Sequence, residues 1–181
     1  KKNSWLYIFG ISIGLGMLSK YSVAFYTASL LAGLLLTKNR TIFLNKHFYF
    51  AAAVALLIML PNISWQYQHG FPIIAHMDEL KETQLQFIDP IDFLLEQIMM
   101  FLPCVFIWLA GLVYVFFSAE GKKYAMIGIS FITVIALLTY MNGKSYYAAG
   151  AYPVLFAFGA YWLEKITTGK FYWIRYAMVL I

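Results

Sequence analysis

The sequence carries little charge and a single cysteine. Of its 181 residues, 12% are charged and 62% are hydrophobic, whereas a soluble domain has about 25% charged residues. With a mean hydropathy of +0.73, so little charge excludes a water-soluble globule and a disordered chain. The lone Cys104 excludes an intramolecular disulfide and a cysteine-built metal site. The composition therefore predicts an integral membrane protein.

Motifs for several common chemistries are also missing. The sequence contains no GxGxxG, Walker loop, HExxH or serine elbow, so nucleotide-dependent chemistry is not expected. The net charge of +5 comes from bases that lie in short clusters between apolar runs. That arrangement is typical of membrane proteins and does not indicate a nucleic-acid partner.

The apolar runs predict an all-α, polytopic transmembrane bundle of six spans plus a truncated seventh. The first apolar block, residues 5–37, carries Lys20 at its middle, and a charge at the bilayer centre costs about 2.5–3.5 kcal/mol. The block is therefore expected to form a hairpin, with Lys20 at its turn. The two arms are predicted at 5–19 and 22–37, and further spans at 48–60, 93–117, 124–141 and 150–163, with a partial one from 172.

Both termini suggest a single transmembrane domain fragment, 1–181, of a longer protein. The chain begins Lys1-Lys2-Asn3 without an initiator methionine and stops inside the apolar run 171–181. That run is too short to span a bilayer, since a crossing helix needs about 20 residues.

The basic residues predict which segments share a membrane face. Pro61 is expected to end a helix, and the following stretch 62–92 is expected to be a polar loop on the outer face. Only three bases then lie outside, namely Lys20, Lys81 and Lys144. The other ten lie inside, as the positive-inside rule requires: Lys1, Lys2, Lys38, Arg40, Lys46, Lys122, Lys123, Lys165, Lys170 and Arg175.

Two outer segments combine a lysine with tyrosines. GLGMLSKYS (14–22) contains Lys20, and MNGKSYYAAGAYP (141–153) contains Lys144 beside Ser145. A tight turn with an ammonium group and backbone N–H donors can bind an anion. If both lysines face one cavity at the rim of the bilayer, a lipid phosphate is the natural ligand. The alternatives are a snorkelling lysine in the first segment and an aromatic-belt turn in the second.

The outer loop and the residues just after it hold six of the eight acidic residues. They could supply a general base or metal ligands, but a solvated loop is the favoured interpretation. His69 and His76 lack metal-ligand spacing and are interpreted as loop residues. The six acids are Asp78, Glu79, Glu82, Asp89, Asp92 and Glu96.

Three motifs together resemble the bacterial PMT-type glycosyltransferases, glycosyltransferase family 39 of the GT-C fold. They are GLGMLSKYS, LPNISWQYQHGFP (60–72) and NGKSYYAAGAYPVLFAFGAYWLE (142–164), and the resemblance runs from about residue 5 to 165. It implies a membrane transferase of the bacterial inner membrane that takes a sugar from a polyprenyl-phosphate carrier on the outer face. The implied acceptor is lipid A, another cell-envelope glycan or a protein hydroxyl. Some relatives use a divalent metal, a point that the resemblance leaves open.

The resemblance also implies roles for individual residues. The family's catalytic Asp lies in a first outer loop that has no counterpart in this sequence, so no catalytic residue is assigned and the fragment alone is expected to be inactive. Lys20 and Lys144 match positions near the donor phosphate. The substrate-pocket candidates are Tyr21, His69, Tyr146 and Tyr147. The alternative functions are a transporter or flippase for an anionic or lipid-linked substrate, and a structural subunit without a site.

Overall fold

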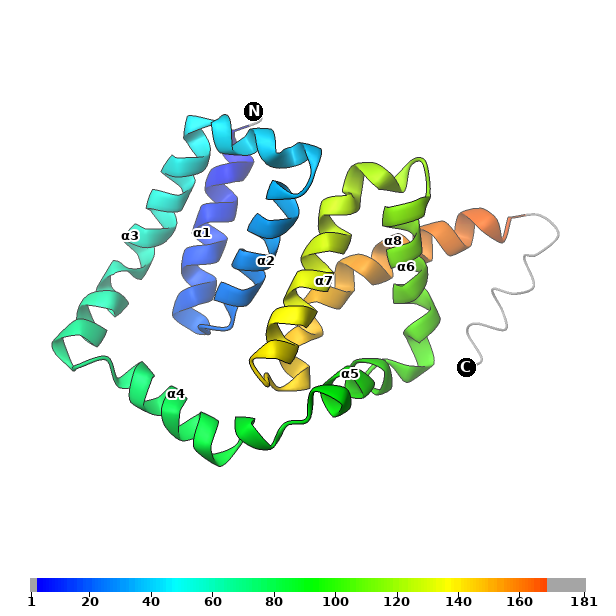
Figure 1. Ribbon diagram of the computed structural model, residues 1–181. Coiled ribbons are helices and arrows are strands. Elements are labelled where there is room, and N and C mark those ends of the chain that lie inside the picture. Colours follow the sequence, from blue (N-terminus) through cyan, green and yellow to red (C-terminus); the bar gives the residue numbers. More distant parts are fainter. Residues whose placement is uncertain (1–2, 169–181) are drawn as a thin grey trace. The chain divides into compact units, whose positions relative to one another are not determined.

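The computed structural model describes residues 3–168, and every regular element in that range is a helix (Figure 1). This confirms the all-α prediction. The chain divides into two compact units, residues 1–88 and residues 89–181. The expected seventh span and four of the expected inner bases, Lys1, Lys2, Lys170 and Arg175, lie outside the described residues.

Unit 1 opens with the predicted hairpin. Helix α1 (Ser4–Ser19) and helix α2 (Val23–Leu35) are joined by a turn at residues 20–22. The chain then forms the 3-10 helix η1 (Lys38–Leu44), which begins where the Thr37 hydroxyl accepts a hydrogen bond from the Asn39 N–H at 3.3 Å. Neither α1 nor α2 contains a charged residue. Lys20 therefore lies at a helix end, as the cost of burying an ammonium group predicts.

Helix α3 (Lys46–Gln68) is longer than the sequence predicts. Asn45 caps its first turn by accepting a 3.0 Å hydrogen bond from the His47 N–H. Pro61 lies inside α3, so the expectation that this proline ends the helix is wrong. A proline removes only one backbone N–H donor, and the remaining hydrogen bonds on both sides of Pro61 carry α3 on to Gln68.

Close contact between α1 and α3 holds unit 1 together. A Cβ atom on Gly14 would come within 2.9 Å of the Ile58 Cβ atom, and one on Gly10 would meet the Ala51 carbonyl oxygen. The absence of side chains at these two positions lets the helix backbones approach, which is the usual way that membrane helices pack.

Residues 62–92 are more ordered than a polar loop. They include the last turns of α3, the helix α4 (Pro72–Thr83), the short 3-10 helix η2 (Leu85–Phe87) and the start of α5. Pro72 occupies the first turn of α4, where its missing N–H has no intrahelical partner to lose. The segment is polar and exposed as expected, but most of it is helical.

Unit 2 contains the remaining helices. In chain order they are α5 (Pro90–Met99), η3 (Leu102–Cys104), α6 (Val105–Phe117), η4 (Gly121–Tyr124), α7 (Ala125–Tyr140), η5 (Ser145–Ala151) and α8 (Tyr152–Ile166). The expected single span 93–117 is bent by 67° between α5 and the helix that follows. Pro103 explains the bend, since it lacks a donor and disfavours helical geometry at the preceding residue.

Aromatic rings and glycines form the core of unit 2. The Tyr152 side chain is fully buried, and its ring meets the rings of Trp108 and Phe131 edge to face at 5.4 and 5.1 Å. Gly111 on α6 and Gly159 on α8 face one another's helix so closely that a Cβ on either would strike a backbone carbonyl. This packing fixes the start of α8, and with it η5, against α6.

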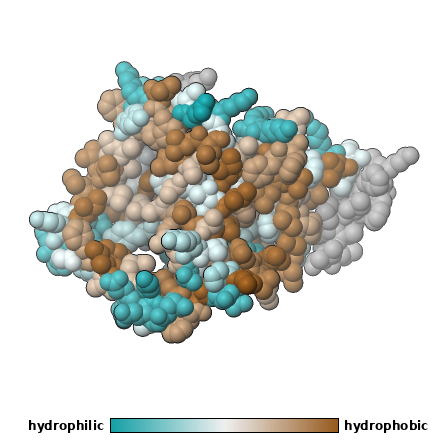
Figure 2. All heavy atoms as spheres, in the orientation of Figure 1, coloured by the Kyte–Doolittle hydropathy of each residue, from teal (hydrophilic) through white to brown (hydrophobic). Residues whose placement is uncertain are grey.

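Two described helices, α3 and the helix Gly121–Tyr140, are long and apolar enough to cross a membrane, or three with the bent pair. This is fewer than the six expected spans. Helix α1 has 16 residues, or about 24 Å at 1.5 Å per residue, against a hydrocarbon core of about 30 Å. On unit 1, hydrophilic residues gather at the η1 end and over α4, with hydrophobic residues between (Figure 2).

Candidate functional site

Lys20 ends α1 and exposes its side chain at the turn between α1 and α2. Its backbone is extended (φ −158°, ψ 124°), while its N–H still donates to the Gly16 carbonyl at 2.8 Å. The side chain therefore leaves the helix where α1 stops. This is the position that the charge pattern predicts for the first phosphate-binding candidate.

Tyr21 joins this turn to α3 through two hydrogen bonds. Its hydroxyl donates to the Asn62 Oδ1 atom at 2.5 Å and accepts from the Gln66 Nε2 atom at 3.1 Å. Gln66 is buried, and its Oε1 atom in turn accepts a 3.3 Å hydrogen bond from the Ile73 N–H at the start of α4. The structure thus brings the LSKYS and LPNISWQ motifs together in one polar cluster, which we call the Tyr21 cluster (Tyr21, Asn62 and Gln66).

His69, another predicted pocket residue, makes contacts only one turn away in its own helix. Its ring stacks on Trp65 at 4.3 Å with an interplanar angle of 22°, and its Nδ1 atom lies 2.8 Å from the Trp65 carbonyl oxygen. Both side chains are exposed. The pair forms an aromatic surface at the end of α3, as expected for residues at a membrane interface.

An apolar cavity of about 440 Å³ lies between α1, α2 and α3. Met17, Ala24 and Met59 line it near the Lys20 turn, and Leu6 and Phe48 line it near the other end of α1. Among the lining residues, Thr27 alone has a polar side chain, and its hydroxyl donates to the Val23 carbonyl at 2.9 Å. The walls therefore offer an occupant no unsatisfied polar group, so they suit a hydrocarbon chain.

The LPNISWQYQHGFP motif and the NGKSYY motif each contain a helix C-cap of the Schellman type. After α3, the Phe71 N–H donates to the Gln66 carbonyl at 2.7 Å around Gly70 (φ 71°). After α7, the Gly143 N–H donates to the Leu138 carbonyl at 2.7 Å around Asn142 (φ 50°). Glycine and asparagine are the residues that tolerate this left-handed position. The turn that carries Lys144 is therefore defined by a helix ending.

Gln97 holds the Lys144 turn against α5. This buried side chain accepts a 3.0 Å hydrogen bond from the Tyr152 hydroxyl and donates to the Ser145 carbonyl oxygen at 3.4 Å. The Ser145 hydroxyl donates to the Glu96 carboxylate. One of the acids interpreted as a solvated loop residue, Glu96, therefore contacts the GKSYY motif directly.

Tyr146 and Tyr147 lie beside one another in η5, after Lys144. Their ring centroids are 4.7 Å apart and the rings are nearly perpendicular. Burial raises the pKa of the Tyr147 phenol above 10, and its hydrogen bond with Tyr146 raises this pKa further. Tyr147 therefore stays neutral near pH 7, and its hydroxyl is engaged with Tyr146.

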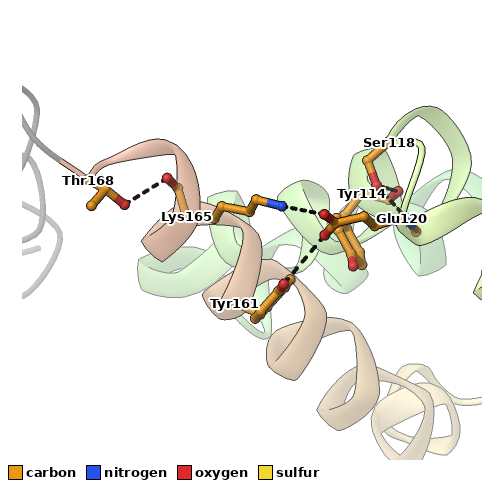
Figure 3. Close-up of polar contacts among 7 residues, drawn as sticks. Tyr114, Ser118, Glu120, Tyr161, Lys165 and Thr168 are labelled. Carbon is orange, nitrogen blue, oxygen red and sulfur yellow. Dashed lines mark hydrogen bonds and ion pairs between the residues drawn. The ribbon is translucent and has the colours of Figure 1, made fainter.

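A separate polar cluster lies at the other end of α7 and α8. The Lys165 Nζ atom is 2.6 Å from a Glu120 carboxylate oxygen, and the Tyr161 hydroxyl donates to the other oxygen at 3.4 Å (Figure 3). The hydrogen bond from Lys165 lowers the pKa of Glu120, and the same bond raises the pKa of Lys165. Both charges are half exposed, so this pair is an ordinary surface tether.

The remaining acidic residues show no constellation for metal binding. Asp89 caps α5 by accepting hydrogen bonds from the Ile91 and Asp92 N–H groups at 2.6 and 3.3 Å. Among residues 3–168, no three histidine, cysteine, aspartate or glutamate side chains are grouped to hold a metal ion. These residues therefore do not by themselves fit the divalent metal that some relatives use.

Uncharged polar residues are what the sequence analysis missed. Asn62, Gln66 and Gln97 each tie a predicted lysine-tyrosine motif to a helix distant in sequence. A polar amide within an apolar run is the sequence feature that could have revealed them. Gln97, for example, lies one turn after the buried Phe93 on the same face of α5. Lys20 and Lys144 belong to different compact units, and their meeting at one phosphate stays a prediction.

Comparison with known proteins gives one match, over the first part of the chain. Residues 1–65, which include Lys20, Tyr21 and Asn62, match the model of the dolichyl-phosphate-mannose-protein mannosyltransferase family. No curated protein and no solved structure matches the chain. The comparison thus shows a similarity to this family over residues 1–65, the part of the chain that holds the LSKYS motif, and the apolar helices indicate an integral membrane protein.

Proposed function

We propose that this chain binds the polyprenyl-phosphate sugar donor of a membrane glycosyltransferase, with the lipid chain in the α1–α3 cavity and the phosphate at Lys20. The observation that carries the proposal is the position of the cavity, whose Met17 and Ala24 end adjoins the Lys20 turn. An apolar cavity beside a turn that carries an exposed lysine suits a lipid with a phosphate head. The family match covers this same part of the chain.

Lys144 is proposed as the second cation at the donor phosphate. When the sugar leaves, negative charge develops on the departing phosphate oxygen, and fixed cations in a dry pocket stabilise that charge. Gln97 positions the Ser145 backbone beside this lysine. The acceptor is proposed to be an envelope lipid, a glycan or a protein hydroxyl on the outer face of a bacterial inner membrane.

The distribution of charge favours a transferase over the transporter alternative. Transporters typically place ionisable groups or broken helices near the bilayer midplane. In α1, α2, α6 and α7 no side chain is Asp, Glu, Lys or Arg, and the only one in α3 is Lys46, its first residue. Lys20 and Lys144 thus lie outside these helices, in turns, which suits the binding of a lipid head group.

Binding of polyprenyl phosphate to the purified protein tests the proposal. Lys20→Ala should weaken binding about 10- to 100-fold, because a hydrogen bond to a charged group contributes about 1.5–3 kcal/mol. Filling the cavity with Ala28→Phe should weaken binding of the long-chain phosphate but not of a short, water-soluble phosphate ester.

The matched control is Lys38→Ala, which removes an exposed lysine at the other end of α2. Titration monitored by native mass spectrometry would measure all four proteins. Equal affinities for Lys20→Ala, Lys38→Ala and the unmodified protein would overturn the assignment of Lys20.

A further inference from the structure

Helix α4 has one apolar face and one acidic face. Ile73, Ile74, Met77 and Leu80 occupy about 120° of its circumference at 100° per residue. The opposite side carries His76, Asp78, Glu79 and Glu82, and the whole helix contains only one base, Lys81. Lys81 lies within the apolar arc at the end of the helix, where a long stem can carry the ammonium group outward.

The apolar face of α4 is uncovered in unit 1. None of its residues is buried, and Ile74 and Met77 are 59% and 42% exposed. Helix α4 has substantial contacts with η2 but not with α1, α2 or α3 within the described part of the chain. Phe71 before the helix and Phe87 after it are also exposed.

A short link ties α4 to the end of a candidate membrane span. Helix α3 is one of the candidate membrane spans, and only residues 69–71 separate its end from Pro72. In that link Gly70 and Phe71 both adopt left-handed geometry, which turns the chain away from the axis of α3 (Figure 1). The hydrogen bond from the Ile73 N–H to Gln66 then fixes the first turn of α4 to the span.

We infer that α4 lies flat in the membrane interface, with Ile74 and Met77 among the lipid chains and the acidic face in water. A helix with one apolar and one charged face that follows a membrane span directly can bury its apolar face among the lipid chains next to that span. Its net negative charge suits a zwitterionic surface. The interfacial helix sets the depth of Gln66 and of the Tyr21 cluster that it contacts.

Spin labels along α4 test this placement. In a Cys104→Ala protein reconstituted in phosphatidylcholine vesicles, single cysteines would replace Ile74, Met77, His76 and Glu79. The labels at 74 and 77 should collide mainly with oxygen, which partitions into lipid, and those at 76 and 79 mainly with a water-soluble nickel complex. We expect the ratio of the two collision rates to differ at least threefold between the faces.

Labels at Leu57, exposed in the middle of α3, and at Lys122, exposed before α7, give the lipid and water references. The four labelled positions on α4 (74, 76, 77 and 79) are all exposed, so the labels should leave the fold intact, and circular dichroism would check this. Nickel collisions dominating at all four positions would show a solvated helix and overturn the inference. Shielding of 74 and 77 from both reagents would show that protein covers the face, and would overturn it equally.

Discussion

The Tyr21 hydroxyl donates a 2.5 Å hydrogen bond to the Asn62 side chain across 41 residues of sequence. This bond joins the turn that carries Lys20 to the part of α3 beyond Pro61. Because Gln66 donates to the same hydroxyl, one phenol links two amide side chains of α3. The position of Lys20 therefore depends on Tyr21.

Tyr21→Phe should destabilise the protein by about 1–3 kcal/mol, since it leaves the buried Gln66 amide without this acceptor. Tyr67→Phe removes a hydroxyl from an exposed side chain in the same helix region and should change stability little. Thermal unfolding of both variants in detergent would compare them. If the unfolding temperature falls no more for Tyr21→Phe than for Tyr67→Phe, the Tyr21 hydroxyl does not contribute to stability.

Lys144→Ala should lower sugar transfer roughly 100- to 1,000-fold, the loss typical of one oxyanion-stabilising donor. Lys144→Arg should recover only part of the activity, because a planar guanidinium does not replace a compact ammonium group. Lys122→Ala, on the predicted inner side, should retain nearly full activity. Equal activities of the two alanine variants at equal expression would remove Lys144 from the phosphate site.

Gln97→Leu should loosen the Lys144 turn. The change removes the acceptor of the buried Tyr152 hydroxyl and the donor to the Ser145 carbonyl, at a cost of about 1–3 kcal/mol. A second change, Tyr152→Phe, should restore part of the stability because no buried hydroxyl is then left unpaired. Chemical denaturation of the single and double variants measures this coupling, and strictly additive losses would argue against the contact.

The Glu120–Lys165 pair predicts a pH dependence with a definite sign. The pKa of Glu120 is lowered from its usual 4.5, so the pair's stabilisation is present above that value and is lost as pH falls through the lowered pKa. The raised pKa of Lys165 means that the stabilisation is also lost as pH rises beyond about 10.5. The pair is thus intact from about pH 5 to 10.

Scanning fluorimetry of Glu120→Gln against the unmodified protein tests this window. From pH 6 to 9 the variant should unfold at a slightly lower temperature than the unmodified protein, and in strong acid both should unfold at the same temperature. Added salt should reduce the difference in unfolding temperature. Glu79→Gln, on exposed α4, should show no such window. A difference that grows on acidification would contradict the sign.

The charge pattern predicts that α4 and the turn before α7 lie on opposite membrane faces. Single cysteines at Glu79 and Lys122, in a Cys104→Ala background, should react with a membrane-impermeant maleimide from opposite sides of sealed vesicles. Labelling from the same side would reject the predicted topology, and with it the proposal that the Lys20 and Lys144 turns share an outer site.

The hairpin turn at Lys20 could be predicted because it depends on the free-energy cost of burying one charge, and the structure confirms it. An ammonium group inside an apolar block predicts the hairpin turn at Lys20, because a buried charge is expensive wherever it stands. Pro61 shows the limit of the same reasoning. A proline costs one hydrogen bond locally, but the flanking turns of a long apolar helix outweigh that cost, so α3 continues.

Contacts between uncharged polar groups were beyond prediction. Whether Gln66 meets Tyr21, or Gln97 meets Ser145, depends on how helices distant in sequence pack, and an amide in an apolar run does not reveal its partner. The acids show the converse. Asp89 and Glu96 look alike in the sequence, yet one caps a helix and the other contacts the GKSYY motif.

The apolar cavity also makes the stability of unit 1 depend on whether lipid is bound. A space of about 440 Å³ leaves the side chains that line it without partner atoms on one side, and the proposed hydrocarbon chain would supply them. A ligand that binds only the folded state adds about 2.7 kcal/mol at a hundredfold excess over its Kd. The protein should therefore unfold at a lower temperature after stripping of lipid, and its resistance to heat should report how full the cavity is.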